Sequence, residues 1–264
     1  MVTFLHFQAI IRAGVSKARL VLGIDLTASN EWQGRRTFSG NCLHKIHLIR
    51  PAQIINPYQR VINIIGKTLK PFTDKEQLWA YGFGDSITKN KEVFNITGKN
   101  EPCEDFQDVL NKYNTMIRQV SLSGPTSFAP IIHRGIRHVI ESGNSFHILV
   151  IIADGQMEDE DETVSAIVEA SNFPLSIVLV GVGDGPWDRM EEFDDNLPAR
   201  NKLKKKLFSV HVSHYMRKCH LVVGGGVCES KAINFLILVK FRIYIGIREE
   251  IWYVVVIISR TLHL

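Results

Sequence analysis

Oxygen-bearing side chains alternate along one short stretch of the sequence, directly after an apolar run. Asp25, Thr27 and Ser29 follow ARLVLGI at a spacing of two residues. Two later segments carry similar groups: LSGPTSF contains Thr126, and HILVIIAD ends in Asp154. Two carboxylates and three hydroxyls suit Mg²⁺, because this ion takes near-octahedral oxygen ligands and retains some water. With so few carboxylates, at least one coordination position is left to water or to an acidic group of a partner.

The same residues also have a purely structural interpretation. Thr27, Ser29 and Thr126 could cap helices or turns, while Asp25 and Asp154 could accept hydrogen bonds from loop amides. Taken alone, the first motif favours this interpretation. The order of the three segments along the chain favours the metal site.

Apolar runs without alternation indicate strands that are buried on both faces, as in a parallel sheet. Such runs cover residues 18–25, 146–154 and 175–183. Residues 78–84 predict a fourth strand, residues 91–97 an antiparallel edge strand, and residues 207–212 a sixth strand.

Helical periodicity separates these strands. It covers residues 56–70, 104–120, 127–143 and 160–172. Strands that alternate with helices predict an α/β fold with a doubly wound, mostly parallel, Rossmann-like sheet and one antiparallel edge strand. In such sheets ligands bind outside the carboxyl ends of the strands, where the strand order reverses. The oxygen-bearing residues are therefore expected to meet at that edge.

Charge is divided unevenly along the 264 residues. Residues 1–199 carry 19 Lys/Arg and 24 Asp/Glu, whereas residues 200–264 carry 12 and 3. The fold signals lie in the acidic part, so the overall charge of +4 does not indicate nucleic-acid binding.

These patterns divide the chain into three parts. Residues 1–16 predict an amphipathic helix, residues 17–212 an α/β domain, and residues 213–264 an atypical basic and apolar tail. The tail lacks turn chemistry and helical period, and it has segments that would be aggregation-prone if exposed. We hypothesise that it is not part of a native domain.

The cysteines and the apolar segments indicate an intracellular protein. Four cysteines are widely spread without a C-x-x-C pair, which is typical of reduced thiols. Neither a signal-peptide core nor an apolar run long enough for a membrane span is evident. We expect a cytoplasmic location, with the nucleus and the plasma-membrane periphery as alternatives.

Several longer motifs resemble one known family. They read GIDLTASNEW, GFGD, GPTSFAPII, IIADGQ, PLSIVLVGVGDGPWD and FDDNLPAR. Over roughly residues 8–212 they are similar to the von Willebrand factor A-type domain of the copine family. They most resemble the copine-like RING-domain ubiquitin ligases, whose domain likewise reads GPTSFAPII.

The resemblance implies a metal-ion-dependent adhesion site. Asp25, Thr27 and Ser29 match its first motif, Thr126 its threonine loop and Asp154 its late aspartate. The implied ion is Mg²⁺ or Mn²⁺, with Ca²⁺ less favoured. The usual first motif is D-x-S-x-S, and Thr27 keeps the hydroxyl that this pattern requires.

Three functions follow from these observations. The first is a protein-binding domain in which a partner's acidic side chain completes the metal coordination. The second is a component of protein ubiquitination, with the ubiquitination machinery as partner; a RING needs closely paired Cys and His ligands, which the sequence lacks. The third is a copine fragment in calcium signalling, with at most peripheral membrane contact. No catalytic constellation stands out, so direct ligase activity would require a RING supplied by another chain.

Three further clusters have simpler explanations. The set His211, His214, Cys219, His220 and Cys228 matches no standard zinc-finger spacing. The lysine run KLKKK is typical of a solvated surface, although it could contact anionic lipid. The acidic run EDEDE at residues 158–162 is suited to the N-terminus of a helix.

Overall fold

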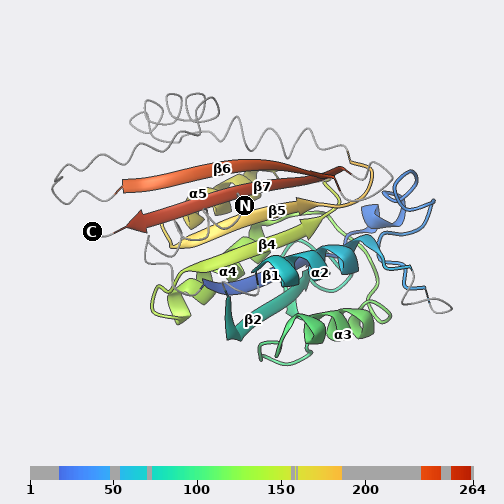
Figure 1. The fold of residues 1–264 in the computed structure, drawn as a ribbon, viewed down its shortest axis with the longest axis horizontal. Helices are drawn as coiled ribbons and strands as arrows, with labels where there is room; N and C mark the ends of the chain where they lie inside the picture. Colours follow the sequence, from blue (N-terminus) through green and yellow to red (C-terminus); the bar gives the residue numbers. More distant parts are fainter. Residues whose placement is uncertain are drawn as a thin grey trace.

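The computed structural model describes residues 18–47, 54–69, 73–155, 158, 160–185, 233–244 and 251–262. In these residues a seven-stranded sheet carries helices on both faces (Figure 1). The strands are β1 (Ala18–Asp25), β2 (Thr73–Phe83), β3 (Phe94–Asn95), β4 (His147–Ala153), β5 (Leu175–Gly181), β6 (Ile233–Tyr244) and β7 (Ile251–Leu262). The helices are η1 (Ala28–Glu31), α2 (Pro57–Leu69), α3 (Phe106–Met116), α4 (Ala129–Glu141) and α5 (Glu160–Ala170).

The strand order is β3-β2-β1-β4-β5-β7-β6. Strands β2, β1, β4 and β5 pair in parallel, and β3 pairs antiparallel to β2 at one edge. This arrangement confirms the predicted mostly parallel α/β sheet with its antiparallel edge strand. After β1 the chain adds β2 and β3 on one side of this strand, and it then crosses back to add β4 and β5 on the other side. The sheet therefore has its switch point between β1 and β4.

Two apolar cores lie on opposite faces of the sheet. Helices α4 and α5 cover one face, with Ile132, Ile136 and Val139 of α4 among the buried residues. Helices α2 and α3 cover the other, where Val61 and Tyr113 pack against β1. Both faces of the central strands are thus buried, which explains why their sequences are continuously apolar.

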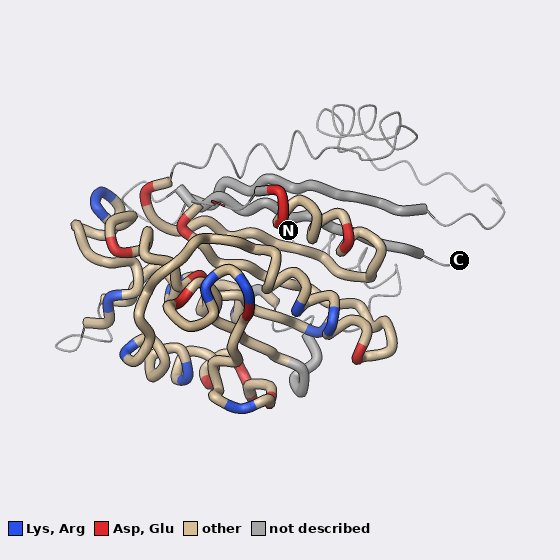
Figure 2. The backbone as a smooth tube through the Cα atoms, turned by 180° about the vertical axis from the view of Figure 1, so that it is seen from behind, with Lys and Arg blue, Asp and Glu red and all other residues tan. Residues whose placement is uncertain are grey.

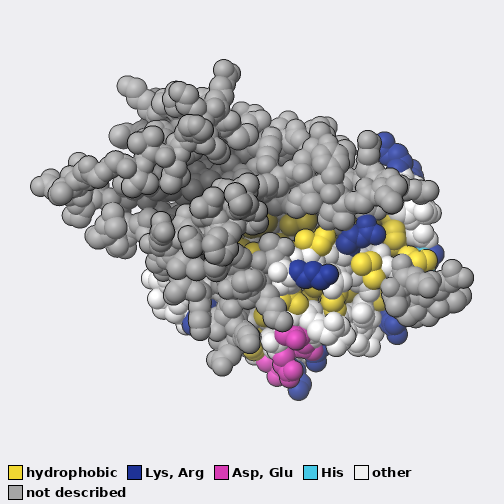
Figure 3. Space-filling view, in the orientation of Figure 1, with side chains coloured by type: hydrophobic (Ala, Val, Ile, Leu, Met, Phe, Trp, Pro, Cys, Tyr) yellow, Lys and Arg dark blue, Asp and Glu magenta, His cyan; other side chains and the backbone are white. Residues whose placement is uncertain are grey.

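Charged residues are distributed differently on the two helix layers that cover the sheet. On the face seen from behind, basic residues lie on α4 and acidic residues on α5 (Figure 2). His133 Nε2 on α4 lies 3.3 Å from Glu169 Oε2 on α5. On the visible part of the α2 and α3 side, basic side chains lie among hydrophobic ones, and acidic side chains gather in one group (Figure 3).

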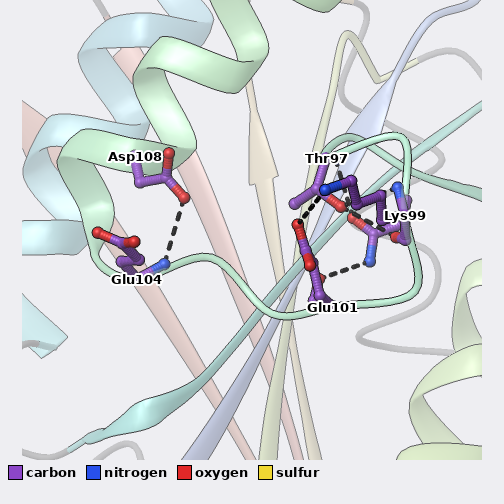
Figure 4. A network of polar contacts seen from close by, with 6 residues as sticks. Thr97, Lys99, Glu101, Glu104 and Asp108 are labelled. Carbon is purple, nitrogen blue, oxygen red and sulfur yellow. Dashed lines mark hydrogen bonds and ion pairs between the residues drawn. The ribbon is translucent and has the colours of Figure 1, made fainter.

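The loop between β3 and α3 is held by its own polar contacts (Figure 4). Asn95 Nδ2 donates to the carbonyl of Glu101 at 2.9 Å, and Thr97 Oγ1 donates to the carbonyl of Lys99 at 2.9 Å. Asp105 then caps α3, because its side chain accepts a hydrogen bond from Asp108 N at 2.8 Å. These contacts fix where α3 begins.

Beyond β5 the sheet is extended by a hairpin that the sequence did not predict. Strand β7 pairs antiparallel with β5, from Ser176 opposite Ile258 to Val180 opposite Val254, and β6 pairs antiparallel with β7. These strands belong to the segment expected to lie outside the domain. The predicted helix over residues 1–16 and strand over residues 207–212 fall outside the described residues.

None of the helices in the described part of the chain has the length and apolar character needed to cross a membrane.

Candidate metal-binding site at the sheet switch point

The two predicted carboxylate ligands come from neighbouring strands at the switch point. Asp25 is the last residue of β1, and Asp154 directly follows β4. The two strands pair up to Ile24 opposite Ile152, so both aspartates leave the sheet at the same edge. Both side chains are fully buried. The switch point thus concentrates two carboxylates where sheets of this type bind ligands.

The surroundings of Asp25 disfavour the charged form of its carboxyl group. Its Oδ1 accepts a hydrogen bond from Thr27 N at 2.9 Å. No group in the described part of the chain donates a hydrogen bond to its buried Oδ2. Burial, and then the nearby carboxylate of Asp154, raise the pKa of Asp25 well above its usual range. A cation bound here would relieve both effects.

The hydroxyls of the first motif face one another. Thr27 and Ser29 are buried, and their hydroxyl oxygens lie 3.0 Å apart. Thr27 is the residue before η1, but its side chain makes no capping hydrogen bond to that helix. This geometry argues against the interpretation of Thr27 as a helix cap.

The threonine loop is tied to both aspartate segments. Ser123 N donates to Leu26 O at 3.2 Å, and Ala28 N donates to Ser123 O at 2.5 Å. Three residues later Thr126 is buried, and its carbonyl accepts a hydrogen bond from Glu158 N at 3.1 Å. The structure therefore brings the segments of all five predicted residues to one edge of the sheet.

Gly84, directly after β2, lies close to Thr27 and Asp25 of the candidate site. Its φ angle is +82°, and a Cβ atom there would lie 2.5 Å from Thr27 Cγ2 and 3.6 Å from Asp25 Oδ1. Only glycine combines this backbone conformation with so close an approach. The GFGD motif is thus explained by its contact with the first motif.

Sequence reasoning missed the support behind Asp25. The ring of His44 is buried, with Nε2 2.8 Å from the carbonyl oxygen of Asp25 and Nδ1 2.8 Å from Tyr113 Oη. A carbonyl can only accept, so Nε2 carries the proton and Nδ1 accepts from the tyrosine. Burial lowers the pKa of His44 to about 3, which keeps the ring neutral in this arrangement.

A second contact path joins the same histidine to the first motif. His44 stacks on Tyr58 with ring centroids 3.9 Å apart. Tyr58 Oη donates to Asn30 Oδ1 at 2.7 Å, and Asn30 Nδ2 donates to Thr27 O at 3.1 Å. Residues of α2 and α3 therefore fix the backbone on which the predicted ligands stand. An isolated histidine in NCLHK offered no sequence signal for this role.

The predicted donor set fits a hard divalent cation. It contains only carboxylate and hydroxyl oxygens, the groups that Mg²⁺ and Mn²⁺ take in proteins. In the described residues no group of three or more His, Cys, Asp or Glu side chains could hold a metal ion. The predicted set contains only two such residues, which is why the hydroxyls matter. The His and Cys cluster over residues 211–228 lies outside the described residues.

Comparison with known proteins identifies the family. The copine family model matches residues 43–219. The chain belongs to the copine family. Among curated relatives, the E3 ubiquitin-protein ligase RGLG2 of Arabidopsis thaliana is 47% identical over 205 residues, which cover 73% of this chain and 43% of the ligase. Copine family protein 1 of Caenorhabditis elegans is 49% identical over 193 residues, covering 73% of this chain and 17% of the worm protein.

The copine chain therefore spans less than half the length of these two relatives. Among solved structures, manganese-loaded TRAP protein of Plasmodium vivax is similar with a TM-score of 0.48 and 13% identity. That match covers 71% of this chain and 65% of the other. A likeness this remote does not bear on the site.

Proposed function

We propose that this chain is a metal-dependent protein-binding domain. Asp25, Thr27, Ser29, Thr126 and Asp154 hold Mg²⁺ or Mn²⁺, and an acidic side chain of a partner protein completes the coordination. The metal acts as an electrostatic bridge between the two proteins. The proposed setting is the cytoplasm, where the chain serves as an adaptor.

One observation carries this proposal. Two fully buried carboxylates, Asp25 and Asp154, lie close enough for the second to raise the pKa of the first. Buried charges normally require a partner of opposite charge. Among the described residues, no lysine or arginine contributes to the shift in the pKa of Asp25. A divalent cation supplies that missing positive charge.

Replacing Asp25 by asparagine tests the proposal with two readouts of opposite sign. Calorimetric titration of the full chain should show Mg²⁺ binding in the parent and none in Asp25→Asn. Without metal the variant should be more stable to denaturant by about 1 kcal/mol, because asparagine removes the cost of burying an ionisable carboxyl group beside Asp154. The loss of Mg²⁺ binding therefore cannot be attributed to unfolding.

The exposed Asp161 on α5 offers a matched control. Asp161→Asn removes the same charge from the exposed first turn of α5; it should leave Mg²⁺ binding unchanged and should not raise the stability, because an acid in the first turn of a helix is stabilising. Equal Mg²⁺ affinity in the parent and in Asp25→Asn would refute the site.

A second candidate function is substrate recruitment for ubiquitination. Identities of 47% and 48% to the ligases RGLG2 and RGLG5 of Arabidopsis thaliana favour it. The full chain should then capture proteins with Mg²⁺ and release them with chelator, and the captured set should be enriched in ubiquitin conjugates. Metal-dependent capture without such enrichment would support the metal-dependent binding function and refute substrate recruitment for ubiquitination.

A further inference from the structure

An open cavity of about 630 Å³ lies beside the proposed metal site. Its volume falls within the range of roughly 300–1,000 Å³ that is typical of ligand pockets. Its lining residues come from the end of η1, from the loop after it and from the segment after α3. They are Glu31, Cys42, His44, Lys45, Ile46, Ile117, Arg118, Val120, Ser121 and Leu122.

Some residues that line the cavity also contact the segments of the proposed metal site. His44 lines the cavity and contacts the carbonyl of Asp25. Leu122 lines it too, and the next residue, Ser123, bonds to both Leu26 and Ala28. A ligand that reaches the proposed metal is therefore adjacent to this cavity.

An exposed apolar side chain extends this surface. Ile87 is 86% exposed, yet its loop is held by Asp85, whose carboxylate accepts hydrogen bonds from Ile87 N at 3.3 Å and Thr88 N at 2.9 Å. Ser86 N donates to Ser121 O at 3.0 Å, which places Ile87 next to the cavity wall. A single exposed isoleucine is common on protein surfaces. Here it stands on a fixed loop beside a cavity with apolar walls.

The charges of the cavity favour an acidic occupant. Lys45 and Arg118 line it against the single acid Glu31, although residues 1–199 as a whole carry an excess of acids. Lys45 donates to the neutral side chain of Asn41, and it forms no ion pair with a carboxylate among the described residues. The local charge is thus opposite to that of the surrounding domain.

We infer that the cavity and Ile87 form a docking surface for an acidic peptide segment of a partner protein. This inference rests on the proposed function: one acidic side chain of the segment reaches the metal. A neighbouring apolar side chain packs between Ile87 and the apolar wall, while a second acid pairs with Lys45 or Arg118. A small molecule inside the cavity would not need Ile87, whereas an extended segment, at about 3.3 Å per residue, spans both.

A peptide array tests the inference. Each peptide carries two aspartate or glutamate residues, with each neighbouring position varied through all residue types, and matched peptides lack one acid or both. The full chain, labelled with a fluorophore, is applied with Mg²⁺ or with chelator. Peptides that combine an acid with Leu, Ile or Phe should bind best, and only with Mg²⁺.

Two surface variants then separate docking from metal binding. Ile87→Ser and Arg118→Glu should each weaken the best peptide about tenfold, because an apolar contact or a charge pair is lost. Their Mg²⁺ affinity should equal that of the parent. Ile140→Ser and Arg137→Glu, on exposed positions of α4 across the sheet, are the matched controls and should bind the peptide normally.

The outcomes distinguish the two proposals. If Ile87→Ser and Arg118→Glu bind both Mg²⁺ and the peptide as the parent does, the docking surface is wrong and the metal site stands. If the parent binds no Mg²⁺, the proposed function itself fails. Equal binding of apolar and polar peptides would also overturn the docking surface.

Discussion

Each face of the sheet has a buried histidine that is hydrogen-bonded to a tyrosine hydroxyl. On the α2 and α3 side, His44 Nδ1 lies 2.8 Å from Tyr113 Oη. On the α4 side, His138 Nε2 lies 2.8 Å from Tyr81 Oη. Burial lowers the pKa of each histidine to about 3. The two pairs are chemically alike.

Their second contacts differ. The other nitrogen of His44 donates to the carbonyl of Asp25 at 2.8 Å, so this pair reaches the proposed metal site. Around Tyr81, Arg134 Nε donates to the hydroxyl at 3.0 Å, and the ring of His138 packs against Trp79 with centroids 4.7 Å apart. Burial and a low pKa alone therefore do not mark a histidine that supports the proposed metal site. His44 is distinguished by the hydrogen bond from its other ring nitrogen to the Asp25 carbonyl.

The largest expected effect comes from replacing each histidine by phenylalanine. His44→Phe removes two buried hydrogen bonds, one to the Asp25 carbonyl and one to Tyr113, whose hydroxyl keeps Asn56, and it should lower the free energy of unfolding by about 2–5 kcal/mol. In His138→Phe, Tyr81 keeps Arg134, and the loss should be about 1–2 kcal/mol. Urea denaturation measures both.

Metal affinity tests the same comparison. Calorimetry should show Mg²⁺ binding weakened about tenfold in His44→Phe, because residues behind a ligand orient it. His138→Phe should bind Mg²⁺ normally. If His44→Phe does not fold, Tyr113→Phe removes one hydrogen bond of the same path and should still weaken Mg²⁺ binding. Equal affinities in these variants and the parent would erase the distinction between the two faces.

Acid stability should depend on both histidines. Their pKa values of about 3 in the folded chain lie below the usual 6.5, so between these values the unfolded chain binds more protons. Their stabilising effect is therefore complete above pH 6.5 and is lost as the pH falls toward 3. The slope is about 1.4 kcal/mol per pH unit for each histidine. His44→Gln and His138→Gln should each flatten the stability profile measured by denaturation between these limits, and an unchanged profile would contradict the buried neutral state.

The apolar pattern of the sequence predicts much of the fold. The run ARLVLGID forms β1 with the expected bounds, Ala18–Asp25, because a strand buried on both faces has no polar interruption. Strand β2 begins at Thr73, before the predicted start at residue 78, since TDKEQ is too polar to indicate a strand. Strands β6 and β7 were missed because their apolar segments are not joined by recognisable turn residues.

The sequence also predicts the segments of the candidate site, but not their support. Asp25 and Asp154 follow apolar strands, so topology alone places them at one edge. His44 contacts the Asp25 carbonyl directly, and it is held in place by Tyr113, which lies 69 residues further along the chain. This pairing depends on how α3 packs against the sheet, and no local sequence pattern predicts the pairing. The predicted metal ligands can thus be chosen from the sequence, whereas the residues that support them cannot.

The smallest expected effect concerns Arg134, a charged partner of Tyr81, whereas Tyr113 beside His44 has the neutral Asn56 in that place. Its Nε donates to Tyr81 Oη, and its guanidinium carbon lies 5.1 Å from the centroid of that ring. Arg134→Met should cost about 1 kcal/mol in urea denaturation, from one hydrogen bond and one cation–π contact. Mg²⁺ affinity should not change, because this path ends in the α4 core rather than at Asp25. A loss of Mg²⁺ binding in Arg134→Met would mean that the two faces are coupled through the sheet, and that His138 also supports the site.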